Sequence, residues 1–408
     1  MISSKMTALV EGSSVIRAMF EEGRRLAKEY GAENVFDFSL GNPNVPAPRA
    51  VNDAMIRLLK EEDPLKLHGY MSNNGFEEVR EAIAGHLNAL YGSSYGADNL
   101  IMTVGAAGGL NVMMRALLDP GDEVICFAPF FGEYRNYVAN FDGKLVIVSP
   151  DTAGFQPKLD EFEEKISKRT KAVIVNSPNN PTGVIYSAET LTRLAGILDK
   201  KQKEFGTSIY LITDEPYREL VYDNATVPWV PDFYVNTIVG YSYSKSLSLP
   251  GERIGYLVIP SGIDDYDNVY SAAGVATRIL GFVNAPSLQQ LAVMNCCGEK
   301  TDISFYDRNR NALYHSLKEL GFECTRPEGA FYLFMKTPAE DDTAFCAKAK
   351  EYNILIVPGS SFGCPGYTRI AYCVAYETIV NSLEGFAKLA ADYGLKGCKQ
   401  TDPEREEK

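Results

Sequence analysis

The chain has 408 residues, of which 45% are hydrophobic and 23% are charged, and its formal net charge is −13. This composition indicates a soluble globular protein with room for two domains. The negative charge argues against general binding of nucleic acids or of anionic membranes, whose phosphates would repel the chain on average. No run of 18 apolar residues occurs, so we expect no membrane span.

Cysteine and histidine usage excludes two further classes of site. The eight cysteines are scattered, no C-x-x-C motif occurs, and there are only three histidines. This pattern argues against a metal site and against a disulfide framework. The first thirty residues also lack a basic start followed by an apolar core, so we expect no secretory signal. We therefore expect a cytoplasmic protein with reduced thiols.

The first predicted element is a helix over about residues 12–30, and the Gly/Pro-rich stretch 41–48 follows it. We assign residues 1–45, this helix and its arm, to the smaller of two domains. Residues 46–290 form the predicted large domain, in which short apolar runs alternate with helical segments. The strands are predicted at 99–104, 122–129, 144–150, 171–178, 208–217, 236–245 and 253–260, and two of the helices at 159–170 and 188–206.

Several of these strands are apolar along their whole length, which is typical of strands covered on both faces. Their alternation with helices predicts an α/β fold whose central sheet is mostly parallel. From residue 291 to residue 400 the pattern changes to a smaller α+β domain. Its helices are predicted at 305–321, 341–353 and 378–394, and its strand-like segments at 329–336, 354–363 and 367–375. Residues 401–408 form a charged tail.

A lysine, Lys245, ends the strand predicted at 236–245 and lies between two serines, eight residues before Arg253. Partial burial and a neighbouring cation lower the pKa of such a lysine and favour attack of its free amine on a carbonyl. Ser242, Ser244 and Arg253 could together bind a phosphate dianion. Considered alone, Lys245 is also compatible with an ordinary solvated lysine at a strand end.

Three further strand ends carry polar or small residues. Asp214 ends one strand with Tyr217 three residues later, and a buried carboxylate there needs a partner such as a pyridinium N–H. Asn180 lies in the turn NSPNNPTG, and the turn GAAGG at 105–109 could offer backbone N–H groups to a phosphate. Taken singly, these features also fit a helix cap and plain turns. Together they predict one site at one edge of one sheet.

In this order of motifs the chain resembles the class I/II aminotransferases, the aspartate-aminotransferase-like family of fold-type-I enzymes that use pyridoxal 5′-phosphate (PLP). The resemblance extends from GNPNVPAP at 41–48 to YTRIAYC at 367–373. It implies a large domain with a mostly parallel central sheet flanked by helices, plus a smaller α+β domain. It also implies an enzyme that moves the amino group of an L-amino acid to a 2-oxo acid, such as 2-oxoglutarate, by a ping-pong mechanism.

The resemblance also implies roles for individual residues. Lys245 matches the Schiff-base lysine, which also shuttles the proton, and Asp214 matches the partner of the pyridine nitrogen. Asn180 and Tyr217 match the pair that hydrogen-bonds the phenolic oxygen of the cofactor. Phe131 occupies the place of the aromatic residue that stacks on the cofactor ring. The phosphate group is matched by Gly105, Ala106, Ala107, Ser242, Ser244 and Arg253.

Substrate and partner contacts follow from the same resemblance. Arg369 matches the arginine that binds the substrate α-carboxylate, together with Asn180 and Gly41. Tyr70 matches a tyrosine that reaches the phosphate in the neighbouring subunit, which implies a homodimer with shared active sites. The second arginine of dicarboxylate-specific relatives has no secure counterpart, because Arg278 is out of register. The amino donor therefore stays open.

Two other functions are compatible with this scaffold. A carbon–sulfur β-lyase would expel a leaving group from Cβ instead of completing transamination. A PLP-binding regulator without enzymatic activity is the second alternative, although such proteins usually carry a fused DNA-binding segment.

Overall fold

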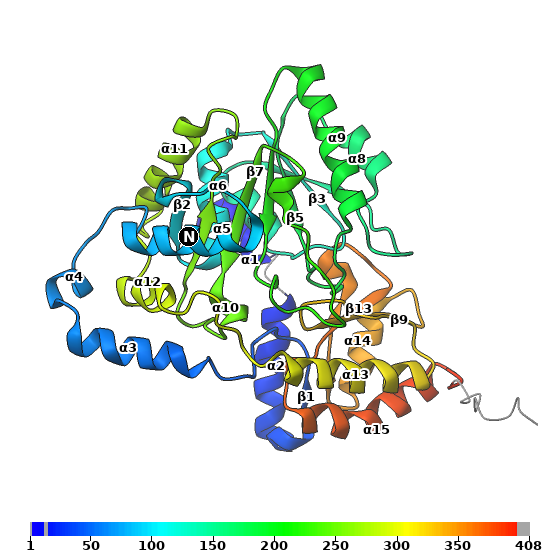
Figure 1. Cartoon of the computed structure of the whole chain (residues 1–408). Coiled ribbons are helices and arrows are strands. Elements are labelled where there is room, and N and C mark those ends of the chain that lie inside the picture. The colour runs from blue at the N-terminus through cyan, green and yellow to red at the C-terminus, as the bar shows by residue number, and fades with distance from the viewer. Residues whose placement is uncertain (1, 12–14, 398–408) are drawn as a thin grey trace, which may run out of the picture.

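The computed structural model describes residues 2–11 and 15–397. It confirms the α/β fold, with a seven-stranded sheet and two smaller sheets (Figure 1). The strands are β1 Phe36–Asp37, β2 Leu100–Thr103, β3 Glu123–Phe127, β4 Lys144–Val148, β5 Thr170–Asn176, β6 Tyr210–Asp214, β7 Thr237–Ser242, β8 Gly255–Val258, β9 Cys324–Thr325, β10 Tyr332–Lys336, β11 Ile354–Leu355, β12 Val357–Pro358 and β13 Tyr367–Ala371.

The α-helices, with four short 3-10 turns beside them, connect and cover these strands. They are α1 Ser4–Glu11, α2 Val15–Tyr30, α3 Arg49–Glu61, α4 Pro64–His68, α5 Glu77–Tyr91, α6 Gly105–Leu117, α7 Tyr134–Asn140, α8 Leu159–Lys165, α9 Ala188–Phe205, α10 Tyr243–Ser246, α11 Tyr266–Ile279, α12 Ser287–Met294, α13 Ile303–Glu319, α14 Asp342–Lys350 and α15 Tyr376–Asp392. Across residues 2–11 and 15–397, no helix combines the length and the apolar character that crossing a membrane requires.

The large sheet has the strand order β2-β8-β7-β6-β5-β3-β4. Strands β3 to β7 run parallel to their neighbours within this group, and β8 pairs antiparallel with both β7 and β2. Alternate residues of β5 face opposite sides, because Ala172 and Ile174 pack in one core cluster and Val173 and Val175 in another. Burial on both faces explains why these strands are apolar along their whole length.

Helices cover both faces of the large sheet, and their apolar residues form its cores. Residues of α6, α7 and α11 pack on one face. On the other face, α8 and α9 cover the part near β3 and β5, and α3, α5 and α12 cover the part near β7 and β8. Helix α9 begins at the N-cap Ser187, whose side chain accepts a hydrogen bond from the Thr190 N–H, and it ends at Gly206 in the left-handed conformation, as predicted.

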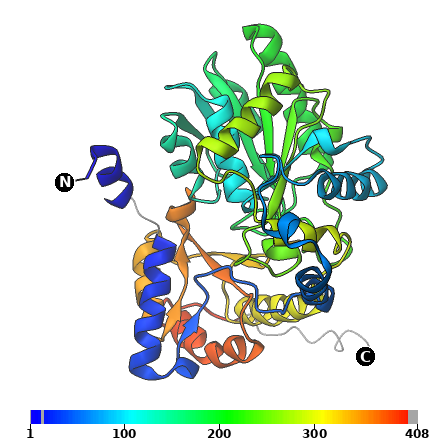
Figure 2. The same ribbon diagram turned by 90° about the vertical axis from the view of Figure 1, so that its left-hand side faces the viewer.

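The C-terminal part of the chain surrounds a four-stranded antiparallel sheet of order β12-β13-β10-β9. Helices α13, α14 and α15 contribute to the buried cluster around β10 and β13. The N-terminal region joins this part, since β1 pairs with β11 and Met19 and Leu26 of α2 pack against Leu355. Figure 2 shows α2 beside the C-terminal elements, away from the large sheet.

Two sequence predictions need comment. The strand predicted at 236–245 ends at Ser242, and Lys245 instead lies in the short helix α10. The cause is local, because the Ser242 side chain accepts a hydrogen bond from the backbone N–H of Ser244 and caps this helix. The predicted helix at 12–30 begins at Val15, and its first residues, 12–14, lie outside the described residues, as does the predicted tail 401–408.

Candidate active site

A cavity of about 270 Å³ lies where three neighbouring strands of the large sheet end, and side chains from the C-terminal part close it. Asn176 ends β5, Asp214 ends β6 and Ser242 ends β7, so the cavity occupies the carboxyl edge that binds ligands in open α/β sheets. The residues that line it are Leu40, Gly41, Ala106, Ala107, Leu110, Phe131, Tyr137, Asn176, Asn180, Asp214, Pro216, Tyr217, Ser242, Ser244, Lys245, Pro250, Arg253, Tyr332 and Arg369.

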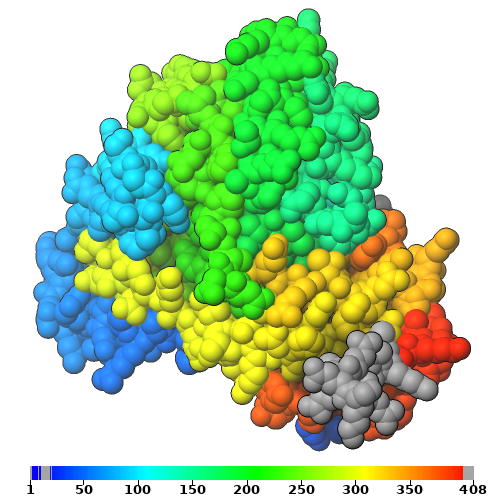
Figure 3. Space-filling model, turned by 45° about the vertical axis from the view of Figure 1, so that its right-hand side comes forward, coloured from blue at the N-terminus to red at the C-terminus, as the bar shows by residue number. Residues whose placement is uncertain are grey.

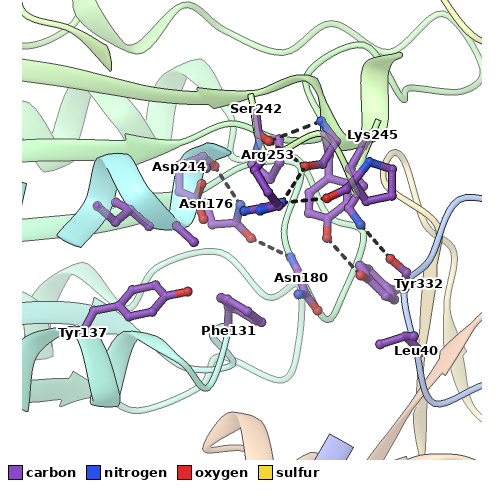
Figure 4. A pocket seen from close by; sticks show the side chains of 18 of the residues that line it. Leu40, Phe131, Tyr137, Asn176, Asn180, Asp214, Ser242, Lys245, Arg253 and Tyr332 are labelled. Atoms are coloured by element: carbon purple, nitrogen blue, oxygen red, sulfur yellow. Dashed lines mark hydrogen bonds between the residues drawn. The ribbon is translucent and has the colours of Figure 1, made fainter. Parts of the chain in front are cut away.

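Lys245 reaches into this cavity from α10 (Figure 4). Its Nζ donates a hydrogen bond to the Gly41 carbonyl oxygen at 2.7 Å and lies 5.4 Å from the centre of the Phe331 ring. Burial lowers the pKa of Lys245 to about 8, and the positive charges of Arg253 and Arg369 act in the same direction. A free amine is therefore accessible near neutral pH, as nucleophilic attack on a carbonyl requires.

Asp214 is buried on the opposite side of the cavity. Its Oδ2 accepts a hydrogen bond from the Tyr134 hydroxyl at 2.6 Å, whereas its Oδ1 is buried and has no hydrogen-bond partner among the residues that the structure describes. Burial raises the pKa of Asp214 to about 7. A buried acceptor without a partner is costly, so this oxygen is suited to an N–H donor supplied by a ligand.

A chain of amides fixes the turn after β5 (Figure 4). The Asn176 Nδ2 donates to the Asp214 carbonyl oxygen at 2.7 Å, and the Asn176 Oδ1 accepts from the Asn180 backbone N–H at 2.7 Å. The Asn180 Oδ1 then accepts from Arg369 Nη1 at 3.0 Å. Arg369 of β13 is thereby connected to the edge of the large sheet.

Arg369 is buried among aromatic rings rather than paired with a carboxylate. Its guanidinium lies 4.5 Å from the centre of the Tyr332 ring and 4.8 Å from that of Phe362, and its Nη2 donates to the Ser39 carbonyl oxygen. Its Nε is buried without a partner, and burial lowers the pKa of Arg369. A buried cation without a counter-ion favours an anionic ligand, and a guanidinium fits a carboxylate with two parallel hydrogen bonds.

Tyr332 connects two parts of the cavity wall. Its hydroxyl lies 2.9 Å from the hydroxyl of Tyr217. The same hydroxyl packs against the backbone of Gly41, where an added Cβ would lie only 1.9 Å from the Tyr332 oxygen. Glycine at position 41 therefore allows the backbone to approach the cavity closely.

The start of α6 and the loop after α10 form an anion-binding corner. Gly105 has φ +75° and packs against Arg253, whose Nη2 donates to the Val104 carbonyl oxygen at 3.2 Å. Ser242 and Ser244 lie beside them, with their hydroxyl oxygens 2.8 Å apart. Backbone N–H groups at a helix start, two hydroxyls and one guanidinium are the groups that bind a phosphate dianion.

This arrangement fits pyridoxal 5′-phosphate, the cofactor that the resemblance implies. The partnerless Oδ1 of Asp214 matches the pyridine nitrogen, the corner at Gly105 and Arg253 matches the phosphate, and the amine of Lys245 lies in the same cavity. The side chain of Phe131 lines the cavity beside Tyr137 (Figure 4). The residues present are thus compatible with the group in charge, hydrogen bonding and shape.

The structure brings together most residues predicted from the sequence, and two of them, Gly105 and Tyr70, do not line the cavity. The cavity is lined by Gly41, Ala106, Ala107, Phe131, Asn180, Asp214, Tyr217, Ser242, Ser244, Lys245, Arg253 and Arg369. Gly105 lies behind the cavity wall against Arg253. Tyr70 is 92% exposed and does not line the cavity, and Arg278 is also exposed at the end of α11.

Sequence reasoning missed several residues of the site. Tyr134 contacts Asp214, and Leu40, Leu110, Tyr137, Asn176 and Tyr332 line the cavity. Asn176 had a usable signal, because it begins the turn NSPNNPTG that carries Asn180. Tyr332 and Tyr134 had none, since only the packing of distant segments brings them to the cavity.

Comparison with known proteins shows that the chain is similar to aminotransferases. The family model "Aminotransferase class I and II" matches residues 33–385. The aspartate aminotransferase of Thermotoga maritima is 31% identical over 360 residues, covering 86% of this chain and 90% of that protein. A probable aspartate/prephenate aminotransferase of Aquifex aeolicus is 30% identical, covering 89% and 93%.

The fold is also similar to those of solved aminotransferase structures. An aminotransferase from Eubacterium rectale superposes with a TM-score of 0.94 at 48% identity, covering 97% of this chain and all of that chain. The aspartate aminotransferase of Thermus thermophilus with maleate superposes with a TM-score of 0.84 at 28% identity, covering 95% and 99%.

Proposed function

The chain belongs to the class I and II aminotransferases, and on that basis we propose a role for each residue of its cavity. It is a PLP-dependent transferase that moves the amino group of an L-amino acid to a 2-oxo acid by a ping-pong mechanism. When bound, the cofactor supplies an aldehyde that reacts with amines and a ring that accepts electrons. The observation that carries the proposal is the partnerless Oδ1 of Asp214 in the same cavity as the amine of Lys245.

Lys245 acts as the tether of the cofactor and as the general acid and base. Its pKa of about 8 leaves roughly a tenth of the amine free at pH 7, and this amine removes the proton from the substrate α-carbon. The Gly41 carbonyl oxygen, which accepts from Lys245 Nζ at 2.7 Å, holds the freed amine inside the cavity. The same amine then returns the proton to a second carbon.

Asp214, Asn180 and Tyr217 orient the cofactor ring. Oδ1 of Asp214 accepts the N–H of the pyridine nitrogen, and the negative charge keeps that nitrogen protonated. Asn180 and Tyr217 hydrogen-bond the phenolic oxygen, and Phe131 stacks on the ring. Backbone N–H groups of Gly105, Ala106 and Ala107 bind the phosphate together with Ser242, Ser244 and Arg253.

Arg369 binds the α-carboxylate of the substrate. Its uncompensated buried charge, its free Nε and its contact with Asn180 support this assignment. The backbone of Gly41 adjoins the same place, where the Tyr332 hydroxyl leaves no room for a Cβ. 2-Oxoglutarate is the proposed acceptor.

The active enzyme is proposed to be a homodimer in which Tyr70 reaches the phosphate of the neighbouring subunit. A tyrosine that is 92% exposed is available for such a contact. Mixing Tyr70→Ala chains with Lys245→Ala chains tests this proposal. In a hybrid dimer, one active site combines the intact Lys245 of one chain with the intact Tyr70 of the other. The second active site carries both substitutions. Recovery of roughly a quarter of wild-type activity is expected from the hybrid fraction. A mixture as inactive as its components would refute the shared site.

We also propose that residues 1–45 and 291–400 form one domain and residues 46–290 the other, which the pairing of β1 with β11 supports. A cytoplasmic location is proposed from the sequence. Free thiols at all seven cysteines within residues 2–11 and 15–397 are compatible with it.

The central experiment is a half-reaction screen. The cofactor-loaded protein is mixed with single L-amino acids, and its absorbance is followed as the cofactor is converted to its amine form. Wild type is expected to convert with at least one amino acid, and Lys245→Ala is expected not to turn over. A Lys245→Ala protein that transaminates at the wild-type rate would refute the assignment.

A further inference from the structure

A second cavity, of about 460 Å³, lies on the face of the large sheet that α5 covers. Its walls come from the end of α5, the segment 218–229, strands β7 and β8, and the segment 296–300. In Figure 3 the cyan, green and yellow surfaces of these segments adjoin one another. None of its lining residues lines the active-site cavity, although Ser246 follows Lys245 directly.

Five aromatic side chains form part of the wall of this cavity. Tyr91 and Trp229 stack with their ring centres 4.2 Å apart, and Tyr241 stacks on Tyr256 at 4.7 Å. Tyr243 completes the group with edge contacts to both Tyr241 and Tyr256. The faces of such rings carry partial negative charge and attract cations.

A carboxylate with one unused oxygen lies among these rings. Glu219 accepts a hydrogen bond from the Tyr241 hydroxyl at 2.8 Å through Oε1, but its Oε2 is buried without a partner. An unpaired carboxylate oxygen is costly to bury, and a donor or a cation in the cavity would offset that cost.

The neighbouring Arg218 already has several partners. Arg218 donates through Nε to Glu215, through Nη1 to the Val227 carbonyl oxygen at 3.1 Å, and through Nη2 to the Pro228 carbonyl oxygen at 2.9 Å. Its guanidinium thus neutralises Glu215, and it lies 5.4 Å from the centre of the Tyr91 ring and 5.0 Å from that of Trp229. Burial raises the pKa of Glu219, so a bound cation would also stabilise the ionised form of this carboxylate. With Glu219 ionised, two carboxylates and one guanidinium leave this wall with one excess negative charge.

The remaining charged groups do not alter this balance inside the cavity. Burial lowers the pKa of His86, so this side chain is neutral at physiological pH. Glu299 and Lys300 are exposed at residues 298–300, where their opposite charges are screened by solvent.

We propose that this second cavity binds a small organic cation, whose ammonium head lies against Glu219 and whose body contacts the surrounding tyrosine and tryptophan rings. The site is separate from transamination but adjoins it. The Tyr241 hydroxyl, which donates to Glu219, lies 2.8 Å from the Ser246 hydroxyl, and Ser246 follows the lysine of the active site.

Choline is a suitable probe, because it has no primary amine that could react with the bound cofactor. Its neutral counterpart of the same shape is 3,3-dimethylbutan-1-ol. The chain contains a single tryptophan, Trp229, which lines this cavity, so tryptophan fluorescence of the cofactor-loaded protein reports on this site alone. Choline is expected to change the fluorescence saturably, and the neutral alcohol is expected to bind at least about tenfold more weakly. Equal binding of both compounds, or no binding of choline, would overturn the proposal.

Two variants test whether the negative charge of Glu219 is the group that binds the cation. Glu219→Gln keeps the acceptor for Tyr241 and removes the negative charge, and it is expected to weaken choline binding about tenfold or more. The control Glu299→Gln, at the exposed mouth, is expected to bind choline as the wild type does. Choline binding that is insensitive to Glu219→Gln would contradict the assignment, as would tighter binding of benzoate than of choline. The comparison of choline with the neutral alcohol tests the proposal even if a variant fails to fold.

Discussion

Replacing Asp214 by asparagine is expected to stabilise the cofactor-free protein while it impairs the reaction. Burial raises the pKa of this carboxyl from 3.8 to about 7. A carboxyl whose pKa is raised by folding contributes stability only at low pH, and this contribution is lost as the pH rises from the unfolded pKa toward the folded one. At 1.36 kcal/mol per pKa unit, keeping the ionised group buried costs about 4 kcal/mol at pH 8 and about 2 kcal/mol at pH 5.

Asparagine removes this pH-dependent cost. Its unpaired amide N–H adds about 1–3 kcal/mol of its own, which is the same at both pH values. The free energy of unfolding of Asp214→Asn relative to wild type should therefore be greater at pH 8 than at pH 5 by about 2–3 kcal/mol. Urea unfolding of the cofactor-free proteins, followed by circular dichroism at both pH values, measures this difference. Asp160→Asn, an exposed change on α8, serves as the control.

In the cofactor-loaded protein the same substitution removes the charge that holds the proton on the pyridine nitrogen. Two unit charges about 4 Å apart interact by about 4 kcal/mol at an effective dielectric constant of 20, which corresponds to roughly a thousandfold in rate. Single-turnover absorbance measurements with cofactor bound report this loss. A variant that reacts within about tenfold of wild type, or whose relative stability is independent of pH, would refute the reasoning.

Three further predictions follow from the cavity. Because burial lowers the pKa of Lys245 to about 8, cofactor capture by the cofactor-free protein should accelerate with pH and level off above about 8; a midpoint near 10.5 in the absorbance kinetics would contradict this. Arg369→Lys should raise the KM for the amino acid about 10- to 100-fold with a smaller effect on kcat, because lysine cannot form two parallel hydrogen bonds to a carboxylate; an unchanged KM would exclude the assigned contact. Tyr332→Phe removes the hydrogen bond to Tyr217 and should slow the half-reaction about three- to tenfold, whereas an unaltered rate would show that this bond does not position Tyr217.

The parts of the site that the sequence predicts are those that depend on local pattern. Each of Asp214, Asn180 and Lys245 follows an apolar run, and the ends of parallel strands necessarily meet at one edge. The order of these motifs then supplies the family and, with it, Arg369. Even so, the strand before Lys245 ends three residues earlier than predicted, because a capping hydrogen bond from the Ser244 N–H to the Ser242 side chain outweighs the β-propensity of the tyrosines.

Residues that act through distant packing were not predictable. The hydrogen bond from Tyr134 to Asp214 joins positions 80 residues apart, and the contact between Tyr217 and Tyr332 joins positions 115 apart. No periodicity or spacing encodes such pairs, since they depend on how α7 and β10 are placed against the large sheet. Tyr70 is the opposite case, because the sequence predicts a role for it but its side chain does not line the cavity of its own chain. That role depends on a second chain.

The wall of the active-site cavity comes from two parts of the fold, the edge of the large sheet and the C-terminal part with the N-terminal segment that joins it. Asp214, Asn180, Lys245 and Arg253 come from the edge of the large sheet, whereas Leu40 and Tyr332 come from segments that pair or pack with the C-terminal strands. Substitutions of Leu40 can retune selectivity without disturbing the groups that activate the cofactor, whereas substitutions of Tyr332 also act on Tyr217, whose hydroxyl lies 2.9 Å away.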